Sequence, residues 1–245
     1  MSDFSKINSL LKTGRASVPA SDDSGVEVFA RYLSEIENLV VVVSDMIRDT
    51  SRIFCGRFAE TLGIDGYTAE NSIWEKAILD LMPEEERNEK YRAELRFFHY
   101  LRHLPRNVRR NYYMASRLRF RTSGHTMTDV LHRMYYIYDA DGESIKYTVC
   151  VYGPVTPGFS GRSMVVNSIT GLTEELSSTT DSKILSRREL QILRLIDSGK
   201  KTAEIASMLS ISPHTVSRHR QEIIGKLQVR NSVEACSLTK SLQLI

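Results

Sequence analysis

The chain has 245 residues, 41% hydrophobic and 26% charged, with a formal net charge of +3. This composition is typical of a soluble globular protein, and the length suits one large domain or two ordinary ones. The longest apolar run, LVVVV at 39–43, is far too short to cross a membrane. The N-terminus lacks the pattern of a targeting segment, and the three cysteines are scattered. We therefore expect a cytoplasmic protein without disulfides and without a membrane partner.

The charge is unevenly distributed along the chain. From residue 183 onward there are 11 Lys and Arg against 5 Asp and Glu, whereas the preceding 182 residues carry 22 against 25. A basic C-terminal segment next to a nearly neutral body predicts a polyanionic partner at that end.

The first part of the chain predicts a mixture of helices and buried strands. Residues 1–30 are assigned to a polar lead, whose end overlaps a first amphipathic helix at 25–39. The run LVVVVSD predicts a buried strand because most of its apolar residues are β-branched, and SRIFCG predicts a second strand. Helices are then expected at 57–63, ending at Gly63, at 72–82 and, as the longest, at 83–104.

Three strand-like runs follow the long helix, at 111–121, 128–140 and 144–155. The second and third are joined by DADGES, which predicts a hairpin, and SMVVNSI at 163–169 predicts an edge strand or an arm. Two strands, small helices and a three-stranded antiparallel meander resemble the order of a PAS domain. The resemblance implies that residues 31–170 form a PAS-like sensor or dimerisation domain.

A short polar segment at 171–183, rich in Ser and Thr, predicts a linker to a second domain at 184–245. Four helices are expected there, and Ser186 with Glu189 has the spacing of a capping box. Gly199 should end the first helix, and Pro213 should open the third, which runs over 213–227. The predicted N-caps of the four helices are Ser186, Thr202, Ser212 and Ser232.

The third of these helices has a buried stripe and a polar outer face. Val216, Ile223, Ile224 and Leu227 repeat at helical spacing, and Ser217, Arg218 and Gln221 fall on the other side. A short helix, a tight turn and a helix with a hydrogen-bonding face follow the plan of a helix-turn-helix, whose second helix enters the major groove.

The whole segment resembles the LuxR-type (GerE-like) DNA-binding domain. The residues that carry this resemblance agree in spacing, caps and core over four helices. They are Leu185, Ser186, Arg188, Glu189, Leu193, Gly199, Glu204, Ile205, Ala206, Leu209, Ser212, Thr215, Val216, His219, Lys226, Leu227 and Ala235. The predicted fold class is therefore α+β, with a PAS-like antiparallel sheet followed by an all-α helix-turn-helix domain.

The resemblance implies a transcriptional regulator that binds double-stranded DNA as a homodimer on an inverted repeat and contacts RNA polymerase. The base-contacting positions fall on Ser217, Arg218 and Gln221. Arg can pair with guanine and Gln with adenine, and the family often has Lys where Ser217 stands here. DNA-backbone contacts are expected from Lys201, Thr202, His214, Thr215, His219, Arg220 and Lys226. The expected dimer contacts of the fourth helix are Val233, Leu238 and Leu242.

Two histidines five residues apart, His214 and His219, raise the alternative of a metal site. No pair of cysteines precedes them, and residues five apart on a helix point about 140° away from each other. We therefore predict no metal at this pair.

Other functions are weaker alternatives. Neither a nucleophile elbow, a phosphate loop nor a catalytic carboxylate pair occurs, so no catalytic residue and no enzymatic activity are predicted. A phosphorylated response regulator would need an acidic pair after its first strand, where only Asp45 stands.

CGRF resembles the flavin-linking cysteine motif of light-sensing PAS domains, but Cys55 stands at the end of a strand and the flavin-contacting residues are not recognisable. A haem ligand could come from His99, His103, His125 or His132, but no spacing singles one out. We therefore predict neither cofactor, and the signal or small ligand of the PAS-like domain is left open. The arginine-rich segment 87–121 is either a solvated, ion-paired face or a binding face.

Overall fold

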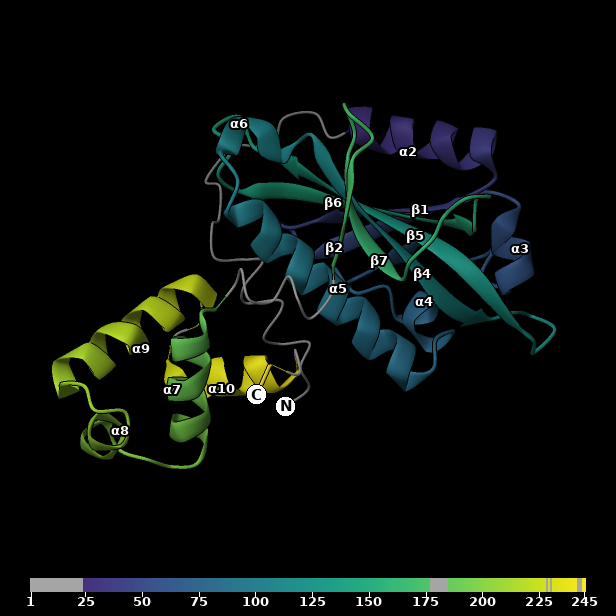
Figure 1. Cartoon of the computed structure of the whole chain (residues 1–245). Coiled ribbons are helices and arrows are strands. Elements are labelled where there is room, and N and C mark those ends of the chain that lie inside the picture. The colour runs from purple at the N-terminus through teal and green to yellow at the C-terminus, as the bar shows by residue number, and fades with distance from the viewer. Residues whose placement is uncertain (1–23, 177–184, 228, 230, 242–243) are drawn as a thin grey trace. The chain divides into compact units, whose positions relative to one another are not determined.

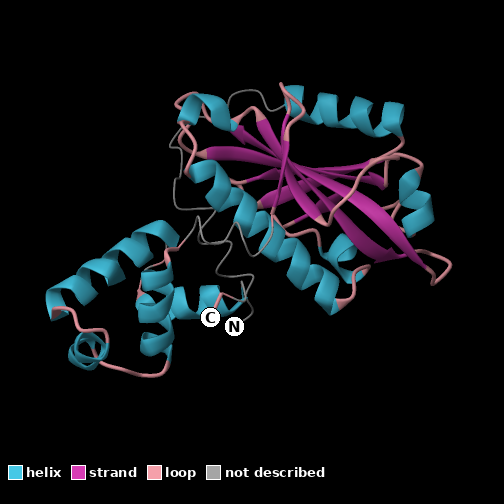
Figure 2. Cartoon of the chain, viewed as in Figure 1, coloured by secondary structure: helices cyan, strands magenta, loops and turns pink. Residues whose placement is uncertain are grey.

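The computed structural model describes residues 24–176, 185–227, 229, 231–241 and 244–245. The chain separates into two compact units. The main boundary between them lies between Leu176 and Ser177. The first unit contains an antiparallel sheet with helices, and the second is built of helices alone in its described part (Figures 1 and 2). The predicted α+β class is confirmed.

The first unit contains an eight-stranded sheet in the order β3-β2-β1-β6-β5-β4-β7-β8, with every pair antiparallel. Its strands are β1 (Val40–Asp45), β2 (Thr50–Cys55), β3 (Ala69–Glu70), β4 (Tyr112–Arg121), β5 (Met127–Tyr138), β6 (Ile145–Pro154), β7 (Ser163–Asn167) and β8 (Thr173–Glu175). Its helices are α2 (Ser24–Glu37), α3 (Phe58–Leu62), α4 (Lys76–Asp80), α5 (Glu84–Arg102) and α6 (Arg106–Arg109). The predicted order of two strands, helices and an antiparallel meander is confirmed.

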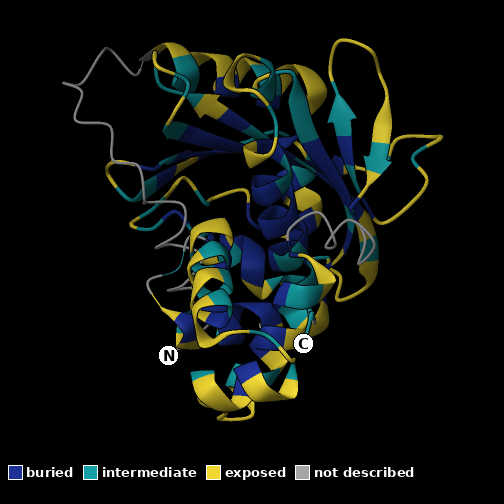
Figure 3. Cartoon of the chain, turned by 60° about the vertical axis from the view of Figure 1, so that its left-hand side comes forward, coloured by how far each residue is buried: buried dark blue, intermediate teal, exposed yellow. Residues whose placement is uncertain are grey.

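Helices lie on both sides of this sheet, α2 on one and α5 on the other (Figure 1). Val41 and Val43 of β1 pack with Ala30 of α2, and the neighbouring valines face the opposite side. Because both faces are covered, a strand of consecutive β-branched residues is stable here, as the sequence predicts. Figure 3 shows the strands of the sheet as mainly buried or intermediate, with exposed residues on loops and helix surfaces.

The turn between β5 and β6 is the predicted hairpin. Gly142 has a φ of 68°, which favours glycine, and the carboxylate of Asp139 accepts hydrogen bonds from the backbone N–H groups of Glu143 and Ser144.

Some predicted elements differ in length or position. The helix expected at 72–82 covers only Lys76–Asp80, because the Ser72 hydroxyl accepts a hydrogen bond from the Trp74 N–H and holds a turn before it. The run at 163–169 forms β7, but β8 pairs with it and takes the edge. β8 falls within the segment 171–183 that was predicted as a linker, and the residues from 177 to 183 lie outside the described part. The short β3 and α6 were not predicted.

The second unit consists of α7 (Arg187–Asp197), α8 (Thr202–Met208), α9 (Pro213–Leu227) and α10 (Ser232–Ser241). Its core is built from apolar side chains of all four helices, each at most 1% exposed. Among them are Ile192, Leu193, Ile205, Val216, Ile223, Leu227, Ala235 and Leu238.

Two of the four predicted N-caps are confirmed. Ser186 and Glu189 form both hydrogen bonds of the capping box, and the Ser212 hydroxyl accepts from the Thr215 N–H at 3.0 Å. Gly199 follows α7 with a φ of 77°.

The other two predicted caps, Thr202 and Ser232, were wrong by one residue. Lys201 is the N-cap of α8, where its backbone N–H donates to the Glu204 carboxylate at 2.7 Å. At α10, the Asn231 side chain accepts from the N–H groups of Val233 and Glu234 at 3.0 and 2.9 Å. Thr202 and Ser232 are thereby the first residues of their helices. In the part of the chain that the structure covers, no helix combines the length and the apolar character needed to cross a membrane.

Candidate nucleic-acid interface

The turn between α8 and α9 is held by backbone and side-chain contacts. Ser210 has a φ of 52°, and the Ile211 N–H donates to the carbonyl of Ala206 at 3.0 Å. From α7, the guanidinium of Arg188 donates to the Leu209 carbonyl at 2.7 Å. These contacts fix the angle at which α9 leaves the turn.

α9 presents opposite faces to the core and to solvent. Val216, Ile223 and Leu227 are at most 1% exposed, whereas Ile224, which was expected in the same stripe, is half-buried. On the outer side, Ser217, Arg218 and Gln221 are all exposed. Because these three positions fall within about 100° of the helix circumference, they form one contiguous polar surface.

The exposed face carries an acidic residue that was not predicted as part of the site. Arg218 Nε lies 3.2 Å from Glu222 Oε1, and the Arg218 side chain is 67% exposed. His219 Nδ1 lies 3.2 Å from the other oxygen of the same carboxylate. The sequence indicates these pairs, because Glu222 follows His219 by three residues and Arg218 by four. Side chains at these spacings on a helix lie next to each other.

Arg220, a predicted backbone contact, bridges three helices. Its Nε donates to the Ser232 hydroxyl of α10 and its Nη1 to the Thr202 hydroxyl of α8, both at 3.1 Å. These contacts hold its guanidinium against the domain, and they engage Thr202 as an acceptor.

Lys226, another predicted backbone contact, pairs with the buried carboxylate of the capping box. Its Nζ lies 2.8 Å from Glu189 Oε2, which also accepts from the backbone and the hydroxyl of Ser186. Burial alone would raise the pKa of Glu189, but these hydrogen bonds hold it below its usual value. Glu189 therefore stays ionised and ties α7 to the end of α9.

The remaining predicted backbone contacts have different environments. Lys201 and His214 are exposed, whereas Thr215 is half-buried and its hydroxyl lies 2.9 Å from that of Ser212. The two histidines of the sequence pair are separated, since His219 groups with Glu189 and Glu222 and His214 does not. The Lys226 ammonium already occupies Glu189 in that group.

The predicted dimer contacts of α10 are only partly accessible. Val233 is 76% exposed, whereas Leu238 is 1% exposed because it packs in the domain core. Leu242 lies outside the described residues.

Residues 183–239 match the family model described as bacterial regulatory proteins, luxR family. The C-terminal unit is a LuxR-type domain. Oxygen regulatory protein NreC of Staphylococcus epidermidis (strain ATCC 35984) is 44% identical over 63 residues, which cover 25% of this chain and 29% of that protein. NreC of Staphylococcus aureus (strain JH9) is 40% identical over 73 residues, or 29% of this chain and 34% of that protein. The match thus spans about a third or less of these relatives, and the LuxR-type domain fills about a quarter of this chain.

Solved structures also align over most of the chain, at low similarity. A phage VqmA–DPO complex aligns over 91% of both chains with 13% identity and a TM-score of 0.36. Escherichia coli SdiA aligns over 99% of this chain and 98% of that one, with 14% identity and a TM-score of 0.26. At such TM-scores these two likenesses support no conclusion about what this chain binds.

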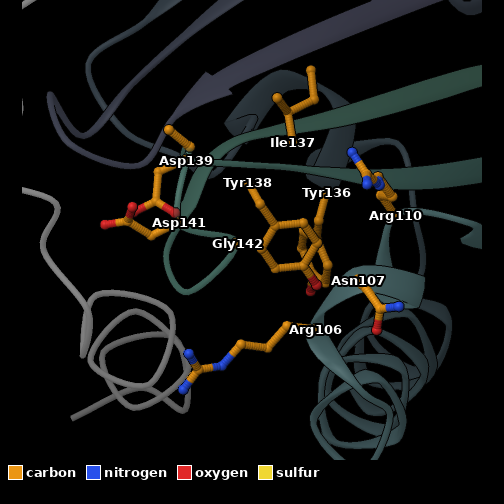
Figure 4. Close-up of a pocket in the computed structure, with 10 residues that line it drawn as sticks. Arg106, Asn107, Arg110, Tyr136, Ile137, Tyr138, Asp139, Asp141 and Gly142 are labelled. Atoms are coloured by element: carbon orange, nitrogen blue, oxygen red, sulfur yellow. The ribbon is translucent and has the colours of Figure 1, made fainter.

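Pockets lie on the described part of the sheet-containing unit. One, of about 470 Å³, lies between α6 and the β5–β6 hairpin, where the rings of Tyr136 and Tyr138 point toward Asn107 (Figure 4). Another, of about 700 Å³, is lined by the sheet face of β4 and β5, by β7 and by the loop after β6, and includes Leu131, Met164 and Phe159.

Several arginines of segment 87–121 are paired inside this unit. Arg92 lies 2.7 Å from Glu89, Arg119 lies 3.1 Å from Glu86, and Arg106 pairs with Glu143. These contacts favour the ion-paired alternative for that part of the segment.

Proposed function

We propose that the chain is a sequence-specific transcriptional regulator in which α9 of the LuxR-type domain enters the major groove of DNA. The observation that carries the proposal is the exposed surface of Ser217, Arg218 and Gln221, directly opposite the buried stripe of the same helix. Such a helix can enter the groove without exposing its core residues. Arg and Gln side chains can each form paired hydrogen bonds with a base edge.

Backbone contacts would come from the ends of the helices around this surface. The N-terminus of α9 presents N–H groups and a helix dipole that favour a phosphate, and Lys201 at the start of α8 adds an exposed ammonium. Arg220 contributes mainly by fixing α9 against α8 and α10, because its Nε and Nη1 are engaged there.

Glu222 gives the free domain an internal partner for Arg218. The pair is largely exposed, so its net stabilisation is small and Arg218 can exchange Glu222 for a guanine. If α9 bound DNA in the wrong register, the Glu222 carboxylate would lie near a phosphate and repel it. This repulsion adds to the specificity of binding.

The test is selection of bound fragments from genomic DNA by the full-length chain, followed by salt titration on the selected sequence. Arg218→Ala should weaken specific binding by roughly 1–3 kcal/mol and relax the preference at one base position. Arg187→Ala, which removes an exposed arginine of α7, is the matched control and should leave the base preference unchanged. Failure of any fragment to compete better than random DNA would overturn the proposal.

We also propose that the sheet-containing unit modulates DNA binding through a small ligand or a protein contact. Its support is a separate compact unit that has pockets of its own. Native mass spectrometry of the full chain as purified from cells tests the ligand branch. A bound small molecule whose removal changes operator affinity is the expected result, and unchanged affinity after its removal would contradict that branch.

A further inference from the structure

α5 carries a buried stripe of charged side chains. Glu86, Lys90 and Glu94 recur at a spacing of four residues and are at most 6% exposed. The Glu86 carboxylate pairs with the exposed guanidinium groups of Arg119 and Arg162, whose nitrogens each lie 3.1 Å from Glu86 Oε1. Lys90 and Glu94 lie deeper, with Lys90 Nζ 2.5 Å from Glu94 Oε1. A helix that covers a sheet normally buries apolar side chains, so this stripe calls for a specific partner.

The polar side chains on the sheet face under α5 include a histidine and a cysteine. His132 of β5 is fully buried, and neither of its ring nitrogens has a hydrogen-bond partner among the described residues. Its ring stacks on Tyr152 of β6 with centroids 4.7 Å apart. Cys150, two residues before Tyr152 on the same face of β6, is a buried free thiol. A buried imidazole without partners is unfavourable unless something binds it.

We propose that Glu94, His132 and Cys150 form a binding site for Zn²⁺ between α5 and the sheet. One ligand atom from each of the three side chains lies within 4.8 Å of the other two. Zinc bonds of about 2.0–2.3 Å would draw these atoms together by about 1 Å. Lys90 leaves the carboxylate able to bind the ion as well, because a carboxylate offers two oxygens and about four lone-pair sites.

The donor set favours zinc over other common ions. Thiolate, imidazole and carboxylate are all zinc ligands, whereas Ca²⁺ and Mg²⁺ prefer oxygen ligands alone. Three protein ligands leave the fourth position of a tetrahedral site open. The second candidate group, Glu189, His219 and Glu222, has no thiol, and its imidazole already pairs with the Glu222 carboxylate.

The protonation states of the free site suit this exchange. The ring of His132 has no hydrogen-bond partner among the described residues, and a neutral imidazole offers a lone pair to an ion. An ordinary thiol has a pKa of about 8.5, so Cys150 enters the site protonated. When zinc binds, the S–H bond breaks, an S–Zn bond forms, and the proton leaves to solvent. The new thiolate balances one of the two charges of zinc, and the Glu94 carboxylate is shared between the ion and the Lys90 ammonium.

The experiment uses the full-length chain, stripped with a chelator and titrated with zinc sulfate against a chromophoric competitor. We expect one zinc per chain at this site. Because loss of an outer-shell partner alone weakens metal binding by about 10–100-fold, Cys150→Ser and His132→Gln should each weaken it by more than about 100-fold. Cys55→Ser, which removes the other cysteine of the same unit, is the matched control and should bind zinc as the parent does.

A second measurement keeps the test valid if a core variant does not fold. Cobalt chloride added to the stripped parent should give a thiolate-to-cobalt charge-transfer band, and this band should persist in Cys55→Ser and in Cys236→Ser. Persistence in both leaves Cys150 as the thiolate ligand. Absence of the band, loss of it in either control, or full zinc affinity in a folded Cys150→Ser chain would overturn the proposal. Since the site lies outside the LuxR-type domain, failure here leaves DNA binding to be judged separately by fragment selection.

Discussion

Arg220 shows how a residue can match a DNA-binding pattern while serving the fold. It links α9 to Thr202 of α8 and to Ser232 of α10 through two hydrogen bonds. Sequence reasoning placed it on a basic helix and expected a phosphate contact. The two hydroxyls that it binds are the residues that were predicted as helix caps, and both stand one position inside their helices. Because Lys201 and Asn231 are the N-caps, the hydroxyls of Thr202 and Ser232 can accept hydrogen bonds from Arg220.

We predict that Arg220→Lys destabilises the LuxR-type domain by about 1–3 kcal/mol, because an ammonium cannot span both hydroxyls as the planar guanidinium does. Chemical denaturation followed by circular dichroism measures the change in the free energy of unfolding. Arg218→Ala, which alters only an exposed pair, should leave that free energy nearly unchanged. Equal stability of Arg220→Lys and the parent would show that the bridge is not structural.

Glu189 makes the stability of the same domain depend on pH. Its pKa is lowered in the folded state, against the effect of burial, by hydrogen bonds from Lys226 and Ser186. A carboxyl of this kind stabilises the fold above its unfolded pKa of about 4.3, and the contribution is lost as the pH falls through the folded value. The parent should therefore lose stability steeply below about pH 4.

Denaturation of Glu189→Gln from pH 7 to pH 3 measures this contribution. The variant should be less stable than the parent at pH 7, and the difference should shrink as the medium becomes acidic. Glu222→Gln removes a more exposed carboxylate and is the control, for which we expect a much smaller difference at pH 7. A constant difference between Glu189→Gln and the parent across the range would contradict the assignment.

At the scale of elements, the end of α2 is fixed against β2 by a close backbone approach at Gly56. A methyl group built on Gly56 would lie 2.2 Å from the carbonyl oxygen of Ser34 and 2.7 Å from backbone atoms of Asn38. These backbone atoms cannot move out of the way as the end of a flexible side chain can. We therefore predict that Gly56→Ala destabilises this unit by about 1–3 kcal/mol or more.

The matched control for this change is Gly66→Ala. Gly66 has nothing within 4 Å of the added methyl, so the substitution should be nearly neutral. Differential scanning calorimetry of the full chain would report the first variant as a lowered transition and the second as unchanged. If both variants have the same transition temperature as the parent, the position of α2 does not depend on the close backbone contact at Gly56.

Local signals were strong enough to predict most long elements and the exposed face of α9. The run of valines, the DADGES turn and the Ser186–Glu189 box each act within a few residues, so the sequence displays them directly. What escaped prediction depends on residues distant in the chain. The pairing of β8 with β7, the bridge of Arg220 and the meeting of Glu94 with His132 and Cys150 all arise from the folded topology. The burial of the charged stripe of α5 likewise arises from packing against the sheet, which its polar periodicity does not reveal.

At the scale of the whole molecule, the excess of basic residues after 183 lies in the LuxR-type domain, and much of the acidic remainder pairs within the other unit. Glu86, Glu89 and Glu94 all have cationic partners there. The two units therefore have separate electrostatic roles, and DNA attraction should come from one of them. Affinity for DNA should accordingly fall as salt is raised, as it does when lysines and arginines displace counterions.

The number of chains that bind one operator depends on the symmetry of the assembly on DNA. If two copies occupy an inverted repeat, their recognition helices must lie about one helical turn of DNA apart, or a multiple of it. Val233 of α10 is 76% exposed, and a β-branched apolar side chain so accessible would be covered in a dimer. Val233→Asp should then keep the domain folded but abolish paired binding, because two carboxylates would meet across the two-fold axis.

Sedimentation velocity of the chain with the selected operator, with and without the substitution, measures the stoichiometry. Leu172→Asp, at a residue 73% exposed in the other unit, is the control and should preserve two chains per operator. Insertion of about 5 base pairs between the half-sites should disrupt paired binding by turning one half-site to the opposite side, and insertion of about 10 should partly restore it. One chain per operator in the parent, or indifference to the inserted spacing, would show that the LuxR-type domain reads DNA as a monomer.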